Sequence, residues 1–418
     1  MSRKRVHALV IGSVMEDVNV RAALAENAAD LTWEHVKYYG EESASSDAEL
    51  QALLSPRAKD AELIIGGGEA TVDARLLRAA PLVRVCTQMA VGYNGVDVGA
   101  AAAQGAWVAN VPVPALREAT ADNALLLMLG ACRHARRGLA LTTALPSARA
   151  EGGAGAGWDY KEMRSIIGDS PTGLTLGIIG FGRVGQSLAY KARAAFGMRV
   201  VYYDLVKRPA VQTPAHVRPW HDGLPPGGGE GDDPLAGGEA AAQWVPLAEL
   251  LRCADVVSLN CLFIPTGPHA NGRLMGAAQF GSMKRGAYFV NASRGGLVDE
   301  QALTAALLSG QLGAVGLDVY EDEPRILRSL AACPRAFLLP HTSSATRQCR
   351  AEMARGMVDN ARRVLFERLA PRYPLNAPAQ RMAELGAPER ARVDAYLDNE
   401  FASAPPPWRP AAAARASL

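Results

Sequence analysis

Little in this sequence points to nucleic acid, to a membrane or to a disulfide framework. The 44 basic and 42 acidic residues leave a net charge of +2, and no long basic run is present, so no contact with nucleic acid is expected. No stretch of about 18 apolar residues occurs, which argues against a membrane-spanning helix. None of the six cysteines forms a CxxC pair. We therefore expect buried free thiols in a reducing compartment, hence a cytoplasmic protein, and no metal site.

The length and the apolar patterning predict a multidomain globular protein. A basic start at residues 1–5 leads into an apolar run too short for a signal peptide. With 418 residues, 49% of them hydrophobic and 21% charged, the chain is long enough for two or three domains. Strand and helix patterns alternate over the first hundred residues. This alternation predicts a parallel sheet with strands at Val6–Ile11, Leu63–Ile65, Val83–Cys86 and Ala106–Ala109.

A second parallel sheet is predicted from residue 174 onward, after a long helix over about Thr120–Gly138. Segments 148–157 and 219–238 are interpreted as peripheral insertions, and the alanine- and proline-rich end beyond about Ala402 is not expected to fold alone. Six apolar runs, separated by helix-length segments, are typical of a doubly wound nucleotide-binding domain: Leu176–Gly180, Val200–Asp204, Val256–Leu259, Tyr288–Asn291, Val315–Val319 and Phe337–Leu339.

The glycine motif Gly180–Gly185 lies between a predicted strand and a predicted helix. Such glycines allow a tight turn and bring a pyrophosphate close to the helix N-terminus. Asp204 follows 19 residues after the motif, where a carboxylate suits the ribose hydroxyls and favours NAD(H). Lys207 and Arg208 come next and leave NADP(H) open as an alternative. The expected cofactor-binding residues of the motif are Gly180, Gly182, Arg183, Val184 and Gly185.

Three later segments each follow a predicted strand, and each carries one chemically useful side chain: Arg294, an acid of the cluster Glu321–Glu323, and His341. Because ligands bind at the carboxyl ends of parallel strands, these side chains are expected to converge in one crevice. Hydride transfer to a 2-keto acid needs an arginine fork for the carboxylate and carbonyl. It also needs a histidine that delivers a proton, and a carboxylate that orients the histidine and keeps it protonated.

These segments and the glycine motif resemble the signatures of the D-isomer-specific 2-hydroxyacid dehydrogenases, with glyoxylate and hydroxypyruvate reductases as the leading comparison. The resemblance extends over roughly residues 6–375. It implies that Arg294 binds substrate and that His341 is the catalytic acid/base. It also implies that Glu323, the acid directly before a proline, is the partner of His341 and that Glu321 is only a rival.

The same resemblance assigns residues outside the three segments. Val91 and Gly92, in the loop 90–97, are expected to hold the substrate carboxylate through backbone N–H groups. Thr120 is expected near the cofactor. Asp318 is expected to accept a hydrogen bond from the nicotinamide carboxamide.

The expected fold class is α/β, with two doubly wound parallel-sheet domains. A discontinuous flavodoxin-like substrate domain, residues 1–115 and 341–375, flanks a central Rossmann NAD-binding domain, residues 116–340, with its insertion at 219–238. Residues 376–418 are expected to be a partly disordered tail. The helix at 120–138 is apolar around much of its circumference, and the family joins subunits through this region, so a homodimer is expected.

The sequence therefore predicts an NAD(H)-dependent oxidoreductase that interconverts a small 2-keto acid, such as glyoxylate or hydroxypyruvate, and its D-2-hydroxy acid, with histidine as proton donor. One alternative stays open. The C-terminal-binding-protein corepressors share this fold and the arginine–glutamate–histidine set, so the chain could instead be an NAD(H)-sensing scaffold.

Overall fold

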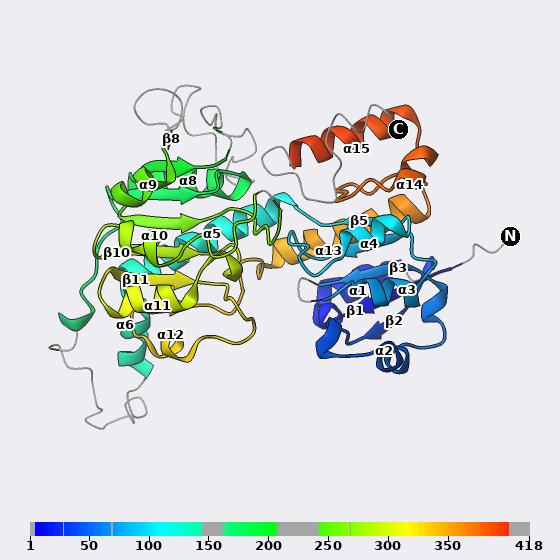
Figure 1. The fold of residues 1–418 in the computed structure, drawn as a ribbon, viewed down its shortest axis with the longest axis horizontal. Helices are drawn as coiled ribbons and strands as arrows, with labels where there is room; N and C mark the ends of the chain where they lie inside the picture. The colour runs from blue at the N-terminus through cyan, green and yellow to red at the C-terminus, as the bar shows by residue number, and fades with distance from the viewer. Residues whose placement is uncertain are drawn as a thin grey trace, which may run out of the picture. The chain divides into compact units, whose positions relative to one another are not determined.

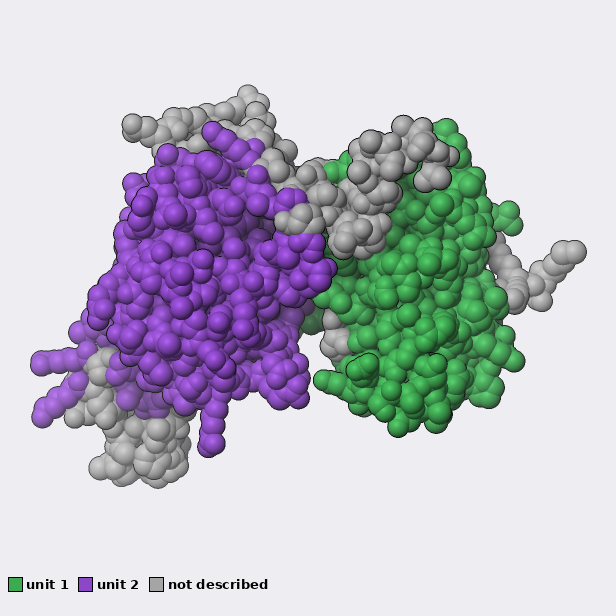
Figure 2. All heavy atoms as spheres, viewed as in Figure 1, with its two compact units in different colours: residues 1–116, 345–418 green, residues 117–344 purple. Residues whose placement is uncertain are grey.

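The computed structural model describes residues 5–27, 29–67, 70–143, 161, 164–205, 207, 242–267 and 269–400. The chain divides into unit 1, residues 1–116 and 345–418, and unit 2, residues 117–344, which are coloured separately in Figure 2. The predicted insertions at 148–157 and 219–238 and the end beyond Ala402 lie outside the described residues.

Unit 1 is built on a parallel sheet whose five described strands have the order β2-β1-β3-β4-β5. This is the flavodoxin-like order of a doubly wound fold. Every residue of β1 is buried, as expected for a central strand covered on both faces. The sequence patterns missed β2, an edge strand in which polar and apolar residues mix. The strands are β1 (Val6–Ile11), β2 (Leu31–Val36), β3 (Ala61–Gly66), β4 (Val85–Gln88) and β5 (Trp107–Ala109).

Five α-helices of unit 1 start at polar caps. Asp17, Ser46, Asp73, Asp97 and Thr346 each accept a backbone N–H from the first turn of the helix that follows. The α-helices of this unit are α1 (Val18–Glu26), α2 (Asp47–Leu53), α3 (Ala74–Ala79), α4 (Val98–Ala103), α13 (Arg347–Leu365), α14 (Ala379–Glu384) and α15 (Ala387–Glu400). Short 3-10 turns are η1 (Val14–Glu16), η2 (Gly40–Glu42) and η3 (Ala58–Asp60).

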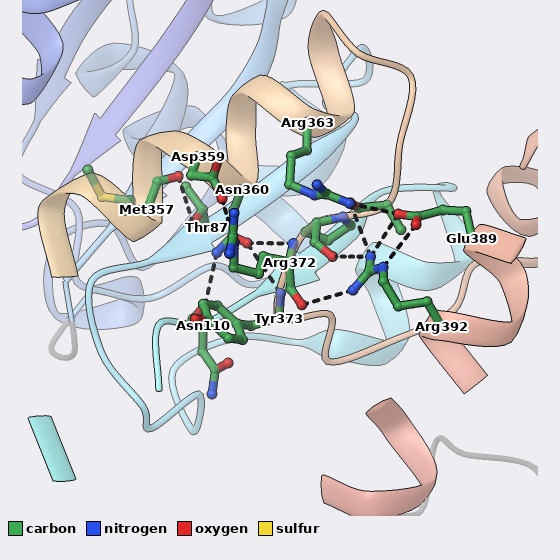
Figure 3. Close-up of polar contacts among 12 residues, drawn as sticks. Thr87, Asn110, Met357, Asp359, Asn360, Arg363, Arg372, Tyr373, Glu389 and Arg392 are labelled. Carbon is green, nitrogen blue, oxygen red and sulfur yellow. Dashed lines mark hydrogen bonds and ion pairs between the residues drawn. The ribbon is translucent and has the colours of Figure 1, made fainter. Parts of the chain in front are cut away.

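A buried amide joins the returning C-terminal segment to unit 1 (Figure 3). The side chain of Asn360, in α13, is 0% exposed; its Nδ2 donates to the carbonyl of Asn110, and its Oδ1 accepts the N–H groups of Arg372 and Tyr373. The segment continues along the edge of the sheet, where Leu375 N–H donates to the carbonyl of Val108 at 2.7 Å. The unsatisfied edge of β5 is thereby covered.

Residues 376–400 differ from the expected tail because they form α14 and α15, which belong to unit 1. Val393 and Leu397 are buried on one side of α15. Glu389, in the first turn of α15, accepts hydrogen bonds from Arg363 of α13 and from Arg392 (Figure 3). An apolar stripe and a shared carboxylate thus hold a segment whose composition alone predicted little structure.

The described part of unit 2 forms one seven-stranded parallel sheet with the order β12-β11-β10-β9-β6-β7-β8. Figure 1 labels β8, β10 and β11 of this sheet. This is the Rossmann order: the strands from β6 to β8 extend the sheet to one side, and the strands from β9 to β12 extend it to the other. The strand order therefore reverses between β6 and β9. All six predicted strands are present, with ends shifted by a few residues. The strands are β6 (Thr175–Ile179), β7 (Arg199–Tyr203), β8 (Gln243–Trp244), β9 (Val256–Leu259), β10 (Ala287–Asn291), β11 (Leu312–Leu317) and β12 (Ala336–Leu338).

Two apolar layers cover the two faces of this sheet. Alternate residues of β10 separate between them, with Phe289 in one core and Tyr288 and Val290 in the other. One layer includes α9 (Leu247–Cys253), α10 (Ala277–Ser282), α11 (Glu300–Leu308) and α12 (Arg328–Ala332), and the other includes α5 (Pro114–Cys132) and α8 (Arg183–Phe196). The remaining elements are α6 (Ala135–Thr143), η4 (Arg164–Ile166) and η5 (Gly295–Leu297). The predicted α/β class with two doubly wound domains is confirmed.

The predicted helix at 120–138 is wrong in its continuity. The structure has two helices, α5 and α6, separated at His134, whose φ of 47° lies in the left-handed region. No helix in the described part of the chain has the length and apolar character needed to cross a membrane.

Candidate active site

The three motif glycines have different surroundings, and these separate their roles. Gly180 has a φ of +92°, and a Cβ there would lie 2.5 Å from the backbone N of Cys261. A Cβ on Gly185 would overlap the carbonyl oxygen of Gly180, so this glycine lets α8 pack closely on β6. A Cβ on Gly182 would meet no described atom within 4 Å. The open space beside Gly182 is where a pyrophosphate could approach the backbone.

The N-terminus of α8 completes a phosphate cradle. Gly182 is the N-cap and provides no side-chain hydrogen bond, whereas a helix start leaves its first N–H groups without intrahelical partners. Arg183 is exposed and Val184 is half-buried in this first turn. Anions are stabilised at such a position by the N–H groups and the helix dipole. The residues present therefore fit a dinucleotide, because the first turn of α8 has no acidic residue that would repel a pyrophosphate.

Asp204 lies directly beside the glycine loop, at the end of β7. Its Oδ2 accepts the N–H of Phe181 at 2.9 Å, and its carbonyl accepts the indole N–H of Trp244 at 3.2 Å. A carboxylate in this position can also reach ribose hydroxyls. Lys207 is exposed, and Arg208 lies outside the described residues. Thr120, the other expected cofactor residue, is half-buried in α5.

Arg294 follows β10 and is held by its own loop. Asn291 Nδ2 donates to the carbonyl of Arg294 at 2.9 Å, and the guanidinium Nη1 donates to the carbonyl of Ser293 at 2.7 Å. Burial lowers the pKa of Arg294, and the carboxylate of Glu323 opposes that effect. Arginine stays protonated in proteins, so the loop holds a largely desolvated cation at the end of the sheet.

His341 and Glu323, which lie in unit 2 like Arg294, form an ion pair or hydrogen bond. His341 Nδ1 lies 2.7 Å from Glu323 Oε2, and Glu323 Oε1 accepts the N–H of Tyr320 at 2.9 Å. Burial by itself would raise the pKa of Glu323, but the hydrogen bond and charge of His341, the Tyr320 N–H and the Arg294 charge together hold it below its ordinary value. Glu323 is therefore a carboxylate at neutral pH.

The rival acid, Glu321, has a different partner. Its Oε1 accepts hydrogen bonds from Arg273 at 2.7 and 2.9 Å. The structure thus brings Glu323, and not Glu321, into contact with His341.

Asp318 has contacts that its expected role did not include. The side chain is 0% exposed, and its two oxygens accept the N–H and hydroxyl groups of Thr342 and Ser343 at 2.5–3.2 Å. The N–H of His341 donates to the Asp318 carbonyl at 2.8 Å, and His341 has a φ of 54°. These contacts join Asp318 to the loop that carries His341, and the expected contact of Asp318 with the nicotinamide carboxamide stays a prediction.

Val91 and Gly92 belong to unit 1, in the loop that follows β4. Both are half-buried. Asn110 Nδ2 donates to the Val91 carbonyl at 2.9 Å, and Val111 N–H donates to the Ala90 carbonyl at 3.0 Å. The carbonyls of this loop are thus held by the protein. Among the described residues there is no cluster of three or more His, Cys, Asp or Glu that could hold a metal ion.

Comparison with known proteins identifies the family. Residues 127–221 and 233–343 match the family described as D-isomer specific 2-hydroxyacid dehydrogenase, NAD binding domain. The chain is 33% identical over 309 residues to a glyoxylate reductase of Korarchaeum cryptofilum, covering 74% of this chain and 81% of that protein. The chain belongs to the D-isomer specific 2-hydroxyacid dehydrogenase family.

Two further comparisons agree with this membership. Glyoxylate/hydroxypyruvate reductase B of Klebsiella pneumoniae is 35% identical over 301 residues, covering 72% of this chain and 80% of that protein. The solved structure of an NADPH-dependent glyoxylate/hydroxypyruvate reductase from Sinorhizobium meliloti, in complex with citrate, aligns with a TM-score of 0.65 at 25% identity, covering 90% of this chain and 99% of that one. This 2-hydroxyacid dehydrogenase is thus an NAD(P)-dependent oxidoreductase, and unit 2 contains its nucleotide-binding domain.

The different surroundings of Gly182 and Gly185 predict different defects in this dehydrogenase. Gly182→Ala should keep the melting temperature of the wild type but weaken NADH binding by roughly tenfold or more, because the methyl group enters the pyrophosphate space. Gly185→Ala should instead destabilise the fold by about 1–3 kcal/mol through overpacking. Thermal unfolding and NADH fluorescence titration measure the two effects. Unchanged NADH binding in Gly182→Ala would show that the cradle does not hold the pyrophosphate.

Proposed function

We propose that this dehydrogenase reduces a small 2-keto acid, glyoxylate or hydroxypyruvate, to its D-2-hydroxy acid with NADH. The observation that carries the proposal is the 2.7 Å contact between His341 and Glu323, in the same unit as Arg294 and the glycine loop. The substrate class is supported by relatives named as glyoxylate and hydroxypyruvate reductases at 33% and 35% identity. Because these relatives are named as enzymes, the scaffold alternative is not proposed.

His341 is the proposed proton donor. The reduced nicotinamide supplies the hydride when the cofactor is bound. The alkoxide that develops on the substrate then needs a proton, which His341 donates from Nε2 while Nδ1 stays on Glu323. The carboxylate of Glu323 fixes the orientation of the imidazole through its contact with Nδ1. In the oxidation direction the neutral imidazole accepts the hydroxyl proton.

Arg294 is the proposed substrate-binding cation. Its planar fork can hold the substrate carboxylate and polarise the carbonyl at once. Desolvation of the guanidinium supports this role, since a cation with little water around it interacts more strongly with an anionic substrate. We extend the proposal to the backbone N–H groups of Val91 and Gly92 as further ligands of the substrate carboxylate.

Asp204 is the proposed determinant of cofactor choice. Its carboxylate, fixed beside the glycine loop by Phe181, would bind the ribose hydroxyls and repel a 2′-phosphate. The NADPH-dependent relative from Sinorhizobium meliloti makes the choice worth testing in this chain. Thr120 remains a proposed neighbour of the cofactor, and Asp318 is proposed to position the His341 loop.

We also propose a homodimer joined through unit 2. Among the exposed large apolar side chains of this unit, three lie on α5, on α6 and directly after η4: Leu126 at 48%, Leu139 at 58% and Ile167 at 75%. Apolar side chains that remain exposed on adjoining segments support a contact surface.

Replacing the proton donor tests the reaction. His341→Ala should lower kcat for both glyoxylate and hydroxypyruvate by roughly 10²–10⁴, the usual contribution of general acid–base catalysis. The Kd for NADH, measured by fluorescence without substrate, should be unchanged. Steady-state turnover by the wild type provides the reference, and a variant with the wild-type kcat would remove His341 from the mechanism.

Replacing Asp204 tests cofactor choice. Asp204→Asn keeps an acceptor for the Phe181 N–H but removes the charge, so the ratio of kcat/KM for NADPH to that for NADH should rise by roughly tenfold or more. Asp204→Ala, which also loses the acceptor, should weaken both cofactors. If the wild type already uses NADPH better, the charge of Asp204 does not govern the choice.

The dimer is tested by mass. Light scattering at low protein concentration should give twice the 44.1 kDa of one chain, consistent with an obligate interface of about 2,000 Å² or more. Leu126→Glu together with Leu139→Glu should shift the mass toward that of one chain. A wild-type mass of a single chain would refute the assembly.

A further inference from the structure

A buried carboxyl outside the proposed catalytic set lies under the loop that carries Glu323. Glu300 is the first residue of α11 and is only 7% exposed. The helix does not need Glu300 as its cap, because Asp299 Oδ1 already accepts the N–H of Ala302 at 2.9 Å. Glu300 Oε1 instead accepts the N–H of Glu321 at 2.7 Å.

The electrostatic surroundings of Glu300 are unfavourable. Burial raises the pKa of its carboxyl, and the neighbouring charges of Glu321 and Asp322 raise it further. Backbone N–H groups of Glu321 and Leu327 act in the opposite direction. A carboxyl that is desolvated beside two other acids is costly unless its hydrogen bonds compensate. Packing alone would be served better by an apolar side chain, so the hydrogen bonds are the informative feature of this residue.

The hydrogen bond fastens one loop, residues 320–327, to the segment 291–300. The loop is held near its start, where Glu300 Oε1 accepts the N–H of Glu321. At Gly295 the same loop lies so close that a Cβ would overlap the carbonyl of Tyr320. Gly295 directly follows Arg294, and the N–H of Tyr320 donates to Glu323. The separation between Arg294 and the Glu323–His341 pair is therefore set by two supports, one steric and one hydrogen-bonded.

We propose that Glu300 is a positioning residue that holds the 320–327 loop on the 291–300 segment, so that Glu323 stays on Nδ1 of His341. This rests on the proposed function for the catalytic consequence, but the positioning itself is a property of the folded protein. Glu300 does not touch the substrate or cofactor in this scheme, and it acts only through Glu323.

Two substitutions separate the hydrogen bonds from the volume of the side chain. Glu300→Met keeps the length and removes the acceptor oxygens, whereas Glu300→Gln keeps one carbonyl acceptor for the Glu321 N–H. Asp299→Ala is the matched control, since it removes the cap of the same helix without touching the loop. Three readouts are needed on the full chain: the melting temperature, the pH profile of kcat/KM for glyoxylate, and the pKa of His341 by NMR of histidine-labelled protein.

Glu300→Met is expected to lower kcat by roughly 10- to 100-fold, because displacement of a catalytic group by about 1 Å has an effect of this size. The NMR titration of His341 and the pH profile should both move from those of the wild type toward those of Glu323→Gln. Glu300→Gln should stay near the wild type in all three readouts. Asp299→Ala should lower only the melting temperature. In the Glu323→Gln background, Glu300→Met should cause no further loss in kcat.

Several outcomes would overturn the proposal. These are a wild-type pKa of His341 in Glu300→Met, an equal loss in Glu300→Gln, full additivity with Glu323→Gln, or a Glu300→Met protein that does not fold. The NMR measurement needs no turnover. If His341→Ala leaves kcat unchanged while Glu300→Met still shifts the pKa of His341, the proposed function fails and the positioning role stands.

Discussion

One buried carboxylate, Asp318, joins the three segments on which the candidate site depends. Its backbone N–H donates to the carbonyl of Asn291 at the end of β10, and its carbonyl accepts the N–H of His341 after β12. Its side-chain oxygens are saturated by Thr342 and Ser343. A fully buried carboxylate is tolerated only when it is hydrogen-bonded in this way. The same contacts hold the left-handed backbone conformation of His341. The orientation of the imidazole therefore depends on Asp318, a residue that takes no part in the proposed proton transfer.

Three carboxyl groups at this edge of the sheet differ in burial and in hydrogen-bond partners, and these differences give them different roles. Asp318 is wholly enclosed and serves the backbone of the His341 loop. Glu300 is buried beside other acids, and its pKa is raised. Glu323 is half-exposed, and contacts with His341, Tyr320 and Arg294 lower its pKa despite partial burial. A carboxyl stabilises an imidazolium when it is ionised and in contact with the ring, which is why the geometry favours Glu323 for that role.

The parts of the fold that follow from periodic apolar patterns were predictable from sequence. All described strands except the edge strands β2 and β8, and the strand–glycine–helix unit around Gly180, were predicted because buried parallel strands are continuous apolar runs. The edge strand β2 was missed because its mixed polarity lacks that signal. The break at His134 was missed because a single left-handed residue leaves no trace in periodicity. Helices α14 and α15 were missed because their contacts are distant in sequence: Arg381 of α14 donates to the carbonyl of Gly105, and Glu389 of α15 accepts from Arg363 of α13.

Side-chain partnership was less predictable than position. Glu321 and Glu323 are equally acidic and two residues apart, so the sequence alone could not separate them without the family resemblance. The two glutamates differ in their hydrogen-bond partners, which are distant in sequence: Arg273 contacts Glu321, and His341 contacts Glu323. Glu300 gave the weakest signal of all, since an acid one residue after a cap is ordinary for the first turn of any helix. Glu300 is distinguished by its burial under the 320–327 loop. The sequence of α11 does not reveal this burial, because it depends on which loop covers the start of the helix. Local sequence motifs therefore predict where the candidate catalytic residues lie in the chain. The residues that hold them in place are determined by how the loops at neighbouring strand ends pack against each other.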